Sequence, residues 1–380
     1  MNFAKTEEQE LLLESLDEFL DGCGFDETYF KDCYYNNRMC SEFSKALLDA
    51  GFGLLGIPEE YGGTQVELQT LVMVAEHLAA RGYPSDVIAN ALQVDDMLTF
   101  GSEEQKKIVF DYLMETGMGC FCLGITEPGA GSDNNMMTAT ATHKGGKVFL
   151  NGNKCFITNA LESPYILYLC READMDGNPI SMYFLPSNSP GVTIKPMHKI
   201  GCKMGSMCEV YVENVELPES ALVGKAGRGF IQLMKNFEIE RLVIAAMAMG
   251  MAECAFNDAA AYANQRVQFG KPIGQQQLIQ EMITEDYTKI LNMRNLVYYT
   301  AWRKDNGQSV RIECNVAKYY CARAGFEVCD NAMQILGGIG YTEDHRVSRM
   351  WRDVRMHRIG GGTDQIMIYT TGKQILKQYT

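Results

Sequence analysis

The stretch FCLGITEPGAGSD, residues 121–133, decides how this chain is interpreted. A short apolar run leads into Thr126, Glu127 and Pro128, and a Gly-Ala-Gly-Ser-Asp turn follows. Glycines let a main chain approach a ligand closely and adopt positive φ. An apolar strand that ends in such a turn presents backbone N–H groups and two hydroxyls to a flat polar ligand. Because most glycine-rich turns are only turns, other segments have to support this interpretation.

Composition restricts the possible functions. The chain has 380 residues, enough for two or three compact units, and 46% hydrophobic and 22% charged residues are ordinary for a globular protein. A formal net charge of −14 argues against nucleic acid or an anionic membrane as a partner. The thirteen cysteines include no Cys-x-x-Cys and the five histidines no His-x3-His, so we expect no metal site.

Targeting signals are not expected. The first ten residues are polar, and the chain lacks a run of about 18 apolar residues, so we expect neither a signal peptide nor a membrane-spanning helix. Free cysteines and 23 methionines suit a reducing compartment, which favours the cytoplasm.

Periodicity divides the chain into three expected domains. Residues 1–116 follow a helical pattern, residues 117–225 alternate like short strands, and residues 226–380 return to helices. This succession predicts an α+β fold rather than a parallel α/β sheet. Thr6 begins a capping box and Ser102 begins a further helix. We expect other helices at 42–50, 66–82, 86–99, 229–263, 275–304, 309–336 and 364–378, and strands at 138–142, 147–152, 165–170 and 209–215.

Four further segments follow residues 121–133 in a characteristic order. They are NGNKCFITN (151–159), RVQFGKPI (266–273), QILGGIGY (334–341) followed by WRDVR (351–355), and RIGGGTDQI (358–366). Together these segments resemble the acyl-CoA dehydrogenase family, and the resemblance extends over residues 3 to 379. It implies an N-terminal all-α domain, a middle β-barrel-like domain and a C-terminal four-helix bundle.

The resemblance implies FAD as cofactor, held between the middle strands and the C-terminal helices. Phe156 stands where the family usually has Trp, and an aromatic ring there stacks on the flavin. Arg266 matches an arginine that reaches the FAD pyrophosphate of a neighbouring subunit, although an arginine before a turn is more often a solvated residue. The residues that match cofactor contacts are Leu123, Ile125, Thr126, Ser132, Phe156, Thr158, Arg266, Phe269, Gln277, Gln334, Gly338, Thr363 and Gln365.

The catalytic base departs from the commoner family pattern. The glutamate that usually fills this role falls at Gly361, which cannot remove a proton, and Asp364 is expected to cap a helix. A subset typified by isovaleryl-CoA dehydrogenase carries the base on a long helix, in a motif matched by FEIERLV (237–243). This match assigns the role to Glu240, and entry into an apolar stretch would raise its pKa. The alternative is a solvated helix glutamate that pairs with a lysine or arginine one turn away.

The substrate is expected to be a short-chain acyl-CoA or enoyl-CoA thioester. Glu238 and Arg241 are spaced to pair on one helix face, and their family counterparts contact CoA. The bacterial short-chain and crotonobetainyl-CoA reductase-type members are the most similar, which implies a homotetramer that exchanges electrons with an electron-transferring flavoprotein. The direction of the reaction stays open. The residues expected to contact substrate are Ser132, Phe237, Glu238, Arg241 and Gln93.

Two alternatives stay open. An acyl-CoA oxidase would pass electrons to O2, but members of that group usually have longer chains. A catalytically silent relative that acts as an interaction protein is favoured only by the absent glutamate at Gly361.

Overall fold

The computed structural model describes residues 5–85 and 94–379, and the side chains of residues 235 and 236 lie outside this description. By its contacts the chain divides into two compact units. The first unit comprises Met1–Lys31, Ala50–Ala89 and Glu238–Thr380, and the second comprises Asp32–Asp49 and Asn90–Phe237. N-terminal segments therefore contribute to both units.

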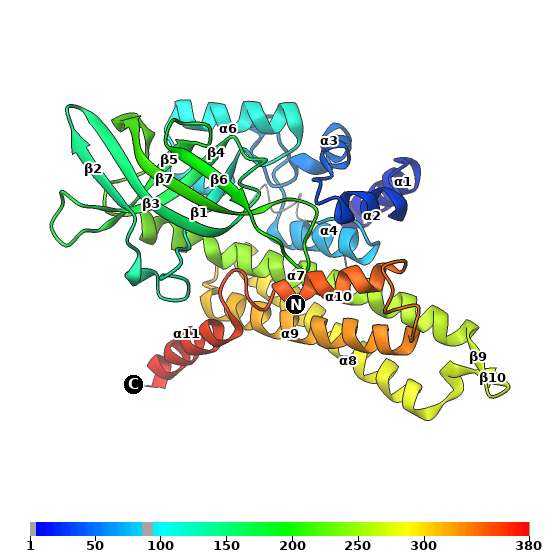
Figure 1. Ribbon diagram of the computed structural model, residues 1–380. Helices are drawn as coiled ribbons and strands as arrows, with labels where there is room; N and C mark the ends of the chain where they lie inside the picture. The colour runs from blue at the N-terminus through cyan, green and yellow to red at the C-terminus, as the bar shows by residue number, and fades with distance from the viewer. Residues whose placement is uncertain (1–4, 86–93, 380) are drawn as a thin grey trace. The chain divides into compact units, whose positions relative to one another are not determined.

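The first unit consists mainly of helices, and small residues bring some of them very close together. Its long helices α8 and α9 lie side by side (Figure 1), and α9 also packs against α10 and α11. Gly250 of α7 approaches α4 so closely that a Cβ would lie 2.4 Å from the carbonyl oxygen of Glu76. The elements are α1 (Glu7–Gly22), α4 (Leu68–Ala80), α7 (Gly229–Gln265, which begins in the second unit), α8 (Gln277–Asp305), α9 (Arg311–Leu336), α10 (Arg346–Met356), α11 (Asp364–Leu376), β9 (Val267–Gln268), β10 (Lys271–Pro272), η1 (Phe52–Leu54), η2 (Glu59–Tyr61), η5 (Ile273–Gln275) and η6 (Lys377–Tyr379).

The second unit is built on an eight-stranded sheet (Figure 1). The strand order is β6-β7-β3-β2-β4-β5-β8, and β1 pairs in parallel with β4. Alternate residues of β3 and β7, such as Val148, Leu150 and Val210, are fully buried in one core. The elements are β1 (Phe121–Gly124), β2 (Thr140–Lys144), β3 (Lys147–Thr158), β4 (Tyr165–Glu172), β5 (Ile180–Pro186), β6 (Val192–Pro196), β7 (Met207–Pro218), β8 (Leu222–Val223), α3 (Ser41–Asp49), α6 (Glu103–Thr116), η3 (Asn134–Met136) and η4 (Glu219–Ala221), while α2 (Glu27–Tyr35) continues from the first unit into the second.

Side chains supply the hydrogen bonds that the first turns of these helices lack. Thr6 and Gln9 form a capping box at α1, and Ser102 and Gln105 form another at α6. A residue remote in sequence caps α4, because the Asp305 carboxylate accepts hydrogen bonds from the Leu68 and Gln69 N–H groups at 2.9 Å each. Unpaired N–H groups and the helix dipole both favour a carboxylate at that end.

The expected helices and strands agree with the structure in type, with small shifts of their ends. The helix expected at 66–82 is α4, which begins at Leu68, and the strand expected at 147–152 extends to Thr158 as β3. The sequence pattern did not predict α2, α10, β5, β6 or β8. Of the helix expected at 86–99, residues 86–93 lie outside the described residues, and residues 94–100 are helical.

Two expected absences concern membrane spans and metal sites. No helix in the part of the chain that the structure describes has the length and apolarity needed to cross a membrane. No group of three or more His, Cys, Asp or Glu side chains within residues 5–85 and 94–379 has the arrangement of a metal site.

Candidate active site

The end of β1 is fixed to β3 by two hydrogen bonds. The Lys154 ammonium donates to the carbonyl oxygen of Ile125 at 3.1 Å, and the Cys155 N–H donates to the carbonyl oxygen of Thr126 at 2.9 Å. Leu123, Ile125 and Thr126 are half-buried. The backbone that the motif was expected to present to a ligand is therefore held in one position.

A buried ion pair supports the same turn. Lys154 and Glu127 are 2.8 Å apart, and their side chains are 0% and 3% exposed. Burial alone raises the pKa of the Glu127 carboxyl, but the Lys154 ammonium and the Thr138 donors outweigh burial and lower it below its usual range. The Glu127 carboxylate also accepts from the Thr138 N–H at 2.7 Å and the Ala139 N–H at 3.0 Å. The pair thus joins the turn after β1, the entry to β2 and the middle of β3. This role of Lys154 could not be predicted from spacing along the chain, because its partner Glu127 lies on a different segment.

Phe156 lies at an irregularity in β3 that turns its ring outward. The register with β7 shifts between Lys154 and Ile157, and Phe156 has a positive φ of 58°. Its side chain is 56% exposed, while Cys155 and Ile157 on either side are buried. Thr158, two residues on, is also exposed. The bulge therefore places an aromatic ring and a hydroxyl on one accessible face of the sheet.

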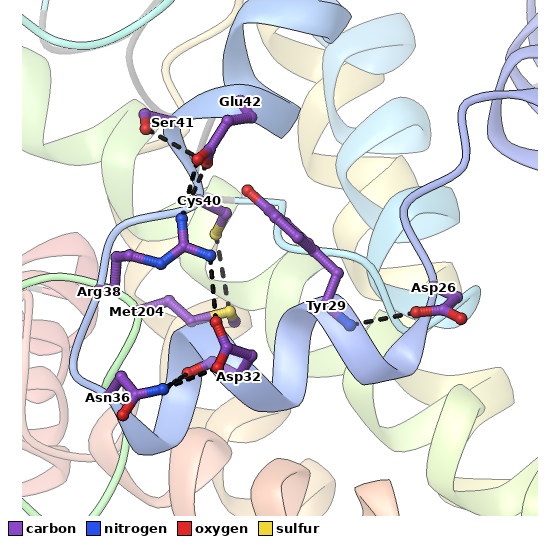
Figure 2. A network of polar contacts seen from close by, with 9 residues as sticks. All are labelled: Asp26, Tyr29, Asp32, Asn36, Arg38, Cys40, Ser41, Glu42 and Met204. Carbon is purple, nitrogen blue, oxygen red and sulfur yellow. Dashed lines mark hydrogen bonds and ion pairs between the residues drawn. The ribbon is translucent and has the colours of Figure 1, made fainter.

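The loop before β7 anchors the end of this strand. The Asn159 N–H donates to the carbonyl oxygen of Ser206 at 2.9 Å. Two residues earlier, the sulfur of Met204 lies 3.6 Å from that of Cys40, as Figure 2 shows. The Lys203 ammonium lies over the Tyr34 ring, 5.8 Å from its centroid. The short segment from α2 to α3 therefore helps to hold the strand that carries Phe156.

The same segment is itself cross-linked by charge. The Arg38 guanidinium donates to both carboxylate oxygens of Glu42 at 3.0 Å and to the Asp32 carboxylate at 3.3 Å (Figure 2). These contacts are exposed, so each contributes little to stability. Their effect is to fix the turn between α2 and α3 on which Cys40 lies.

This part of the second unit fits a flat heteroaromatic ligand. An exposed aromatic face, a fixed turn of backbone and the hydroxyls of Thr126, Ser132 and Thr158 are a donor set for stacking and hydrogen bonding. Ser132 is exposed in the turn. A flavin ring has both the flat surface and the polar edge that such a set requires.

In the first unit, Glu240 lies on α7 and is half-buried. Among the residues whose side chains the structure describes, none makes a hydrogen bond or ion pair with its carboxylate. Burial raises the pKa of the Glu240 carboxyl, and the Arg241 and Lys318 charges counter this only in part. An unpaired carboxyl with a raised pKa has the properties of a general base.

Residues 360–362, named here the glycine loop, are held by two cationic side chains. Arg241 donates to the carbonyl oxygen of Gly361 at 3.2 Å and to the side-chain oxygen of Asn315 at 2.9 Å. Lys318, which is 0% exposed on α9, donates to the carbonyl oxygen of Gly362. Gly361 has a φ of +64°, and a Cβ there would lie 2.7 Å from Cδ1 of Ile244. This conformation disfavours any side chain at position 361.

Two expectations about this region were wrong. Thr363, not Asp364, is the N-cap of α11, because its hydroxyl accepts from the Ile366 N–H at 3.2 Å. The Asp364 carboxylate instead accepts from Arg358 at 2.8 Å. Glu238 does not pair with Arg241. It lies 3.9 Å from Arg311, because the Arg241 side chain turns toward the glycine loop.

Most of the other expected site residues lie in the first unit and are accessible at its surface. Phe269 is 95% exposed at the tip of the β9–β10 hairpin, where it and Gly270 both have positive φ. Gly338 follows the C-cap of α9. Phe237, the last residue of the second unit, is half-buried, and Gln93 lies outside the described residues. The exposed residues are Arg266, Phe269, Gln277, Gln334, Gly338 and Gln365.

Known proteins resemble the chain over its whole length. Acyl-CoA dehydrogenase N-terminal, middle and C-terminal domain families match residues 6–116, 122–215 and 227–376. A probable acyl-CoA dehydrogenase, YdiO, of Escherichia coli K12 is 50% identical over 100% of this chain and 99% of its own. The chain belongs to the acyl-CoA dehydrogenase family. Its three-domain fold is the one that the sequence predicted, and relatives in this family are oxidoreductases that act on CH–CH groups.

Solved acyl-CoA dehydrogenase structures agree with this assignment. Butyryl-CoA dehydrogenase of Megasphaera elsdenii matches with a TM-score of 0.89 and 28% identity, over 99% of this chain and 100% of its own. A chain from work on the electron transferring flavoprotein of Acidaminococcus fermentans and flavin-based electron bifurcation matches with a TM-score of 0.89 and 31% identity, over 99% and 100%. Members of the acyl-CoA dehydrogenase family are FAD-dependent.

Removal of the Lys154 charge should destabilise the protein strongly. Lys154→Met leaves the Glu127 carboxylate buried without its cation, so we expect a loss of about 3 to 5 kcal/mol in the free energy of unfolding. Lys147→Met is the matched control, because Lys147 lies on the same strand and pairs with Glu216 at the surface. It should cost less than about 1 kcal/mol. Urea denaturation followed by circular dichroism measures both, and equal losses would contradict the assigned role of Lys154.

Lys318 should make stability depend on alkaline pH. Burial lowers its pKa from 10.5 to about 8, so between these values the unfolded chain binds more protons than the folded one. The free energy of unfolding then rises with pH across this window, by about 3 kcal/mol for this group at most. The difference in stability between the wild type and Lys318→Met should therefore grow in favour of the wild type from pH 8 to 10. A difference that stays constant in urea denaturation across this range would show that folding does not lower the pKa of Lys318.

Proposed function

We propose that the protein is an FAD-dependent acyl-CoA dehydrogenase or enoyl-CoA reductase that acts on a short-chain thioester. The observation that carries this proposal is Glu240, a carboxylate on α7 with a raised pKa and with no hydrogen-bond partner among the described side chains. The family match supports the reaction class. The likeness to a butyryl-CoA dehydrogenase supports a short acyl chain.

Glu240 acts as the base in the oxidative direction. Its carboxylate takes the proton from the α-carbon of the thioester, and in the reductive direction the carboxylic acid returns that proton. FAD, when bound, supplies the acceptor for the hydride that leaves the β-carbon. A raised pKa brings the carboxyl closer to the working pH, so that it can both accept and release a proton.

The residues of the second unit bind the flavin ring. Phe156 would supply an aromatic face for the ring and exclude water there, and Thr126, Ser132, Thr158 and the turn backbone would supply hydrogen-bond donors for its polar edge. The Lys154–Glu127 pair fixes these donors in advance, so that little ordering is left to be done on binding. Ser132 also contacts the CoA portion of the substrate.

Surface residues of the first unit bind the FAD of a neighbouring copy in a homotetramer. Arg266 carries a guanidinium that suits a diphosphate, and it stands directly before the exposed hairpin that carries Phe269. Gly338 lacks a Cβ at the exposed end of α9, which admits an adenosine group closely. The further contacts in this set are Gln277, Gln334, Thr363 and Gln365.

Electrons are exchanged with an electron-transferring flavoprotein rather than with O2. The likeness to a chain from a study of such a flavoprotein supports this partner. The thirteen free cysteines of the described residues suit a reducing cytoplasm. Arg241 and Phe237 contribute to CoA binding. Glu238 contributes less, because its carboxylate faces Arg311.

A panel of thioesters tests the function and the chain length together. The purified protein should be yellow, and anaerobic addition of a four-carbon acyl-CoA should bleach the flavin faster than a sixteen-carbon one. Buried CH2 groups each contribute about 0.8 kcal/mol, so a site built for long chains would reverse this order. Fastest bleaching by the sixteen-carbon thioester would contradict the short-chain assignment. Stoichiometric O2 consumption would identify an oxidase, and a colourless protein would favour a silent relative.

Glu240→Gln should abolish flavin reduction without abolishing binding. The amide keeps the size and hydrogen bonding of the side chain but cannot accept the proton, so we expect a loss of about 10²- to 10⁴-fold in the reduction rate. Anaerobic stopped-flow absorbance measures the rate, and FAD content and thioester binding are the controls. Glu240→Asp should retain part of the activity, because a carboxylate remains. Reduction by Glu240→Gln at the wild-type rate would place the base elsewhere, with Glu238 and Asp364 next to be tested.

A further inference from the structure

We propose that Lys318 is a positioning residue for this reaction, which holds the glycine loop and supplies a fixed positive charge that acts on Glu240. The inference rests on the function proposed above. It assigns a role to a buried lysine that neither the sequence motifs nor the expected cofactor and substrate contacts include.

The contacts of Lys318 show how it holds the loop. Its side chain is 0% exposed on α9, and its ammonium donates to the carbonyl oxygen of Gly362. Its Cε lies 4.0 Å from the position that a Cβ on Gly361 would take. Arg241 binds the preceding carbonyl, that of Gly361, at 3.2 Å. Two cations on two different helices therefore bind successive carbonyl groups of one loop.

The charge of Lys318 is not neutralised at short range. Among the described residues, no carboxylate lies within 4.0 Å of its ammonium. Asp364, whose charge raises the pKa of Lys318 and so counters part of the effect of burial, pairs with Arg358 at 2.8 Å. A buried ammonium without a paired carboxylate is costly to stability. Arg241, the neighbour of Glu240 on α7, binds the same loop as Lys318, and the Lys318 charge lowers the pKa of the Glu240 carboxyl.

The titratable groups around Lys318 come from three elements. Glu240 and Arg241 lie on α7, Asp364 begins α11, and His357 is the C-cap of α10. His357 is 1% exposed, and burial together with the Lys318 charge lowers its pKa to about 4, so it is neutral at pH 7. Burial also lowers the pKa of Arg241, which stays charged. Lys318 and Arg241 are thus the cations that favour the carboxylate form of Glu240.

The positive charges of Lys318 and Arg241 oppose the effect of burial on the pKa of Glu240. Burial raises the pKa of the Glu240 carboxyl and so favours the protonated form, which cannot accept the α-proton. A nearby positive charge restores the carboxylate form, and a charge fixed by a backbone contact does so without competing for the carboxylate as a hydrogen-bonded partner would. Lys318 therefore sets the pH at which Glu240 works while it leaves the carboxylate free.

The test compares four single variants as holoenzymes. Lys318→Met removes both the charge and the hydrogen bond, Lys318→Gln keeps a donor for the Gly362 carbonyl, and Lys318→Arg keeps the charge. Lys289→Met is the matched control, since Lys289 lies on α8 and pairs with Asp286 at 3.5 Å, away from the loop contacts. Infrared spectra of protein labelled with ¹³C-glutamate, minus the spectrum of Glu240→Gln, follow the protonation of Glu240 against pH. Stopped-flow flavin reduction by a four-carbon acyl-CoA gives the acid limb of the rate profile.

Both neutral variants should move the Glu240 titration and the acid limb upward by about one pH unit or more, because an opposite charge nearby typically lowers a carboxyl pKa by that amount. Below the limb this is a tenfold slower reduction. Lys318→Arg should restore the wild-type limb. If Lys318→Met does not fold, Lys318→Gln decides alone.

Three results would overturn the proposal. The first is a Glu240 titration in Lys318→Gln that coincides with that of the wild type. The second is an acid limb of the rate profile that does not move when the Glu240 titration moves. The third is an effect of Lys289→Met as large as that of the Lys318 variants. A wild-type flavin that no acyl-CoA reduces would instead refute the proposed function, and the infrared titration would then still decide whether Lys318 acts on Glu240.

Discussion

The burial of charge next to flexible backbone is the constraint on which the described arrangement depends. Glycine-rich turns allow close approach of a ligand, but they have no side chains with which to fix themselves. In both units the side chain of a buried lysine fixes such a turn by a hydrogen bond to one of its carbonyl groups. Lys154 binds the Ile125 carbonyl after β1, and Lys318 binds the Gly362 carbonyl before α11. Each turn is thereby held from a rigid neighbouring strand or helix.

The two lysines differ in how their charge is balanced, and the difference matches their surroundings. Lys154 has a partner, Glu127, at 2.8 Å, so the pair is neutral and its effect is structural. Among the described residues, Lys318 has only a carbonyl at hydrogen-bond distance, so its charge is not paired and can act on other groups such as Glu240. A neutral ion pair such as Lys154–Glu127 suits a site at which a flat, uncharged ring is bound by stacking. A charged support suits a site that must keep a carboxylate ionised.

Much of the fold could be predicted because the signals are local. Capping boxes at Thr6 and Ser102 define helix starts, and alternation in residues 209–215 gives β7. The elements that were missed lack such a signal. Strand β5 is buried almost throughout, so it does not alternate, and α10 follows a glycine-rich turn and contains four arginines that obscure its apolar face. Partnerships between distant residues, such as Asp305 with α4, cannot be read from periodicity at all.

The candidate site was less predictable, because contacts between residues distant in sequence determine its geometry. Motifs supply the identity of Phe156 and Glu240, but not the bulge that turns the ring outward or the charges around the carboxylate. The i, i+3 spacing of Glu238 and Arg241 predicted an ion pair on geometric grounds. That prediction was wrong because two acceptors remote in sequence, the Gly361 carbonyl and Asn315, bind Arg241 instead. Spacing along one helix shows which contacts are possible, and tertiary partners determine which one forms.

The glycine at position 361 and the glutamate at position 240 are linked through this packing. With φ at +64° and Ile244 only 2.7 Å from the place that a Cβ would occupy, the loop accommodates glycine far better than a long acidic residue. The loop is drawn into that conformation by Arg241, the immediate neighbour of Glu240, and by Lys318. A base carried on the loop would need this backbone to relax and would lie beside the same cations. A base carried on α7 leaves the loop closed and keeps the carboxylate on a rigid helix, which suits a group whose position relative to the α-carbon determines the rate.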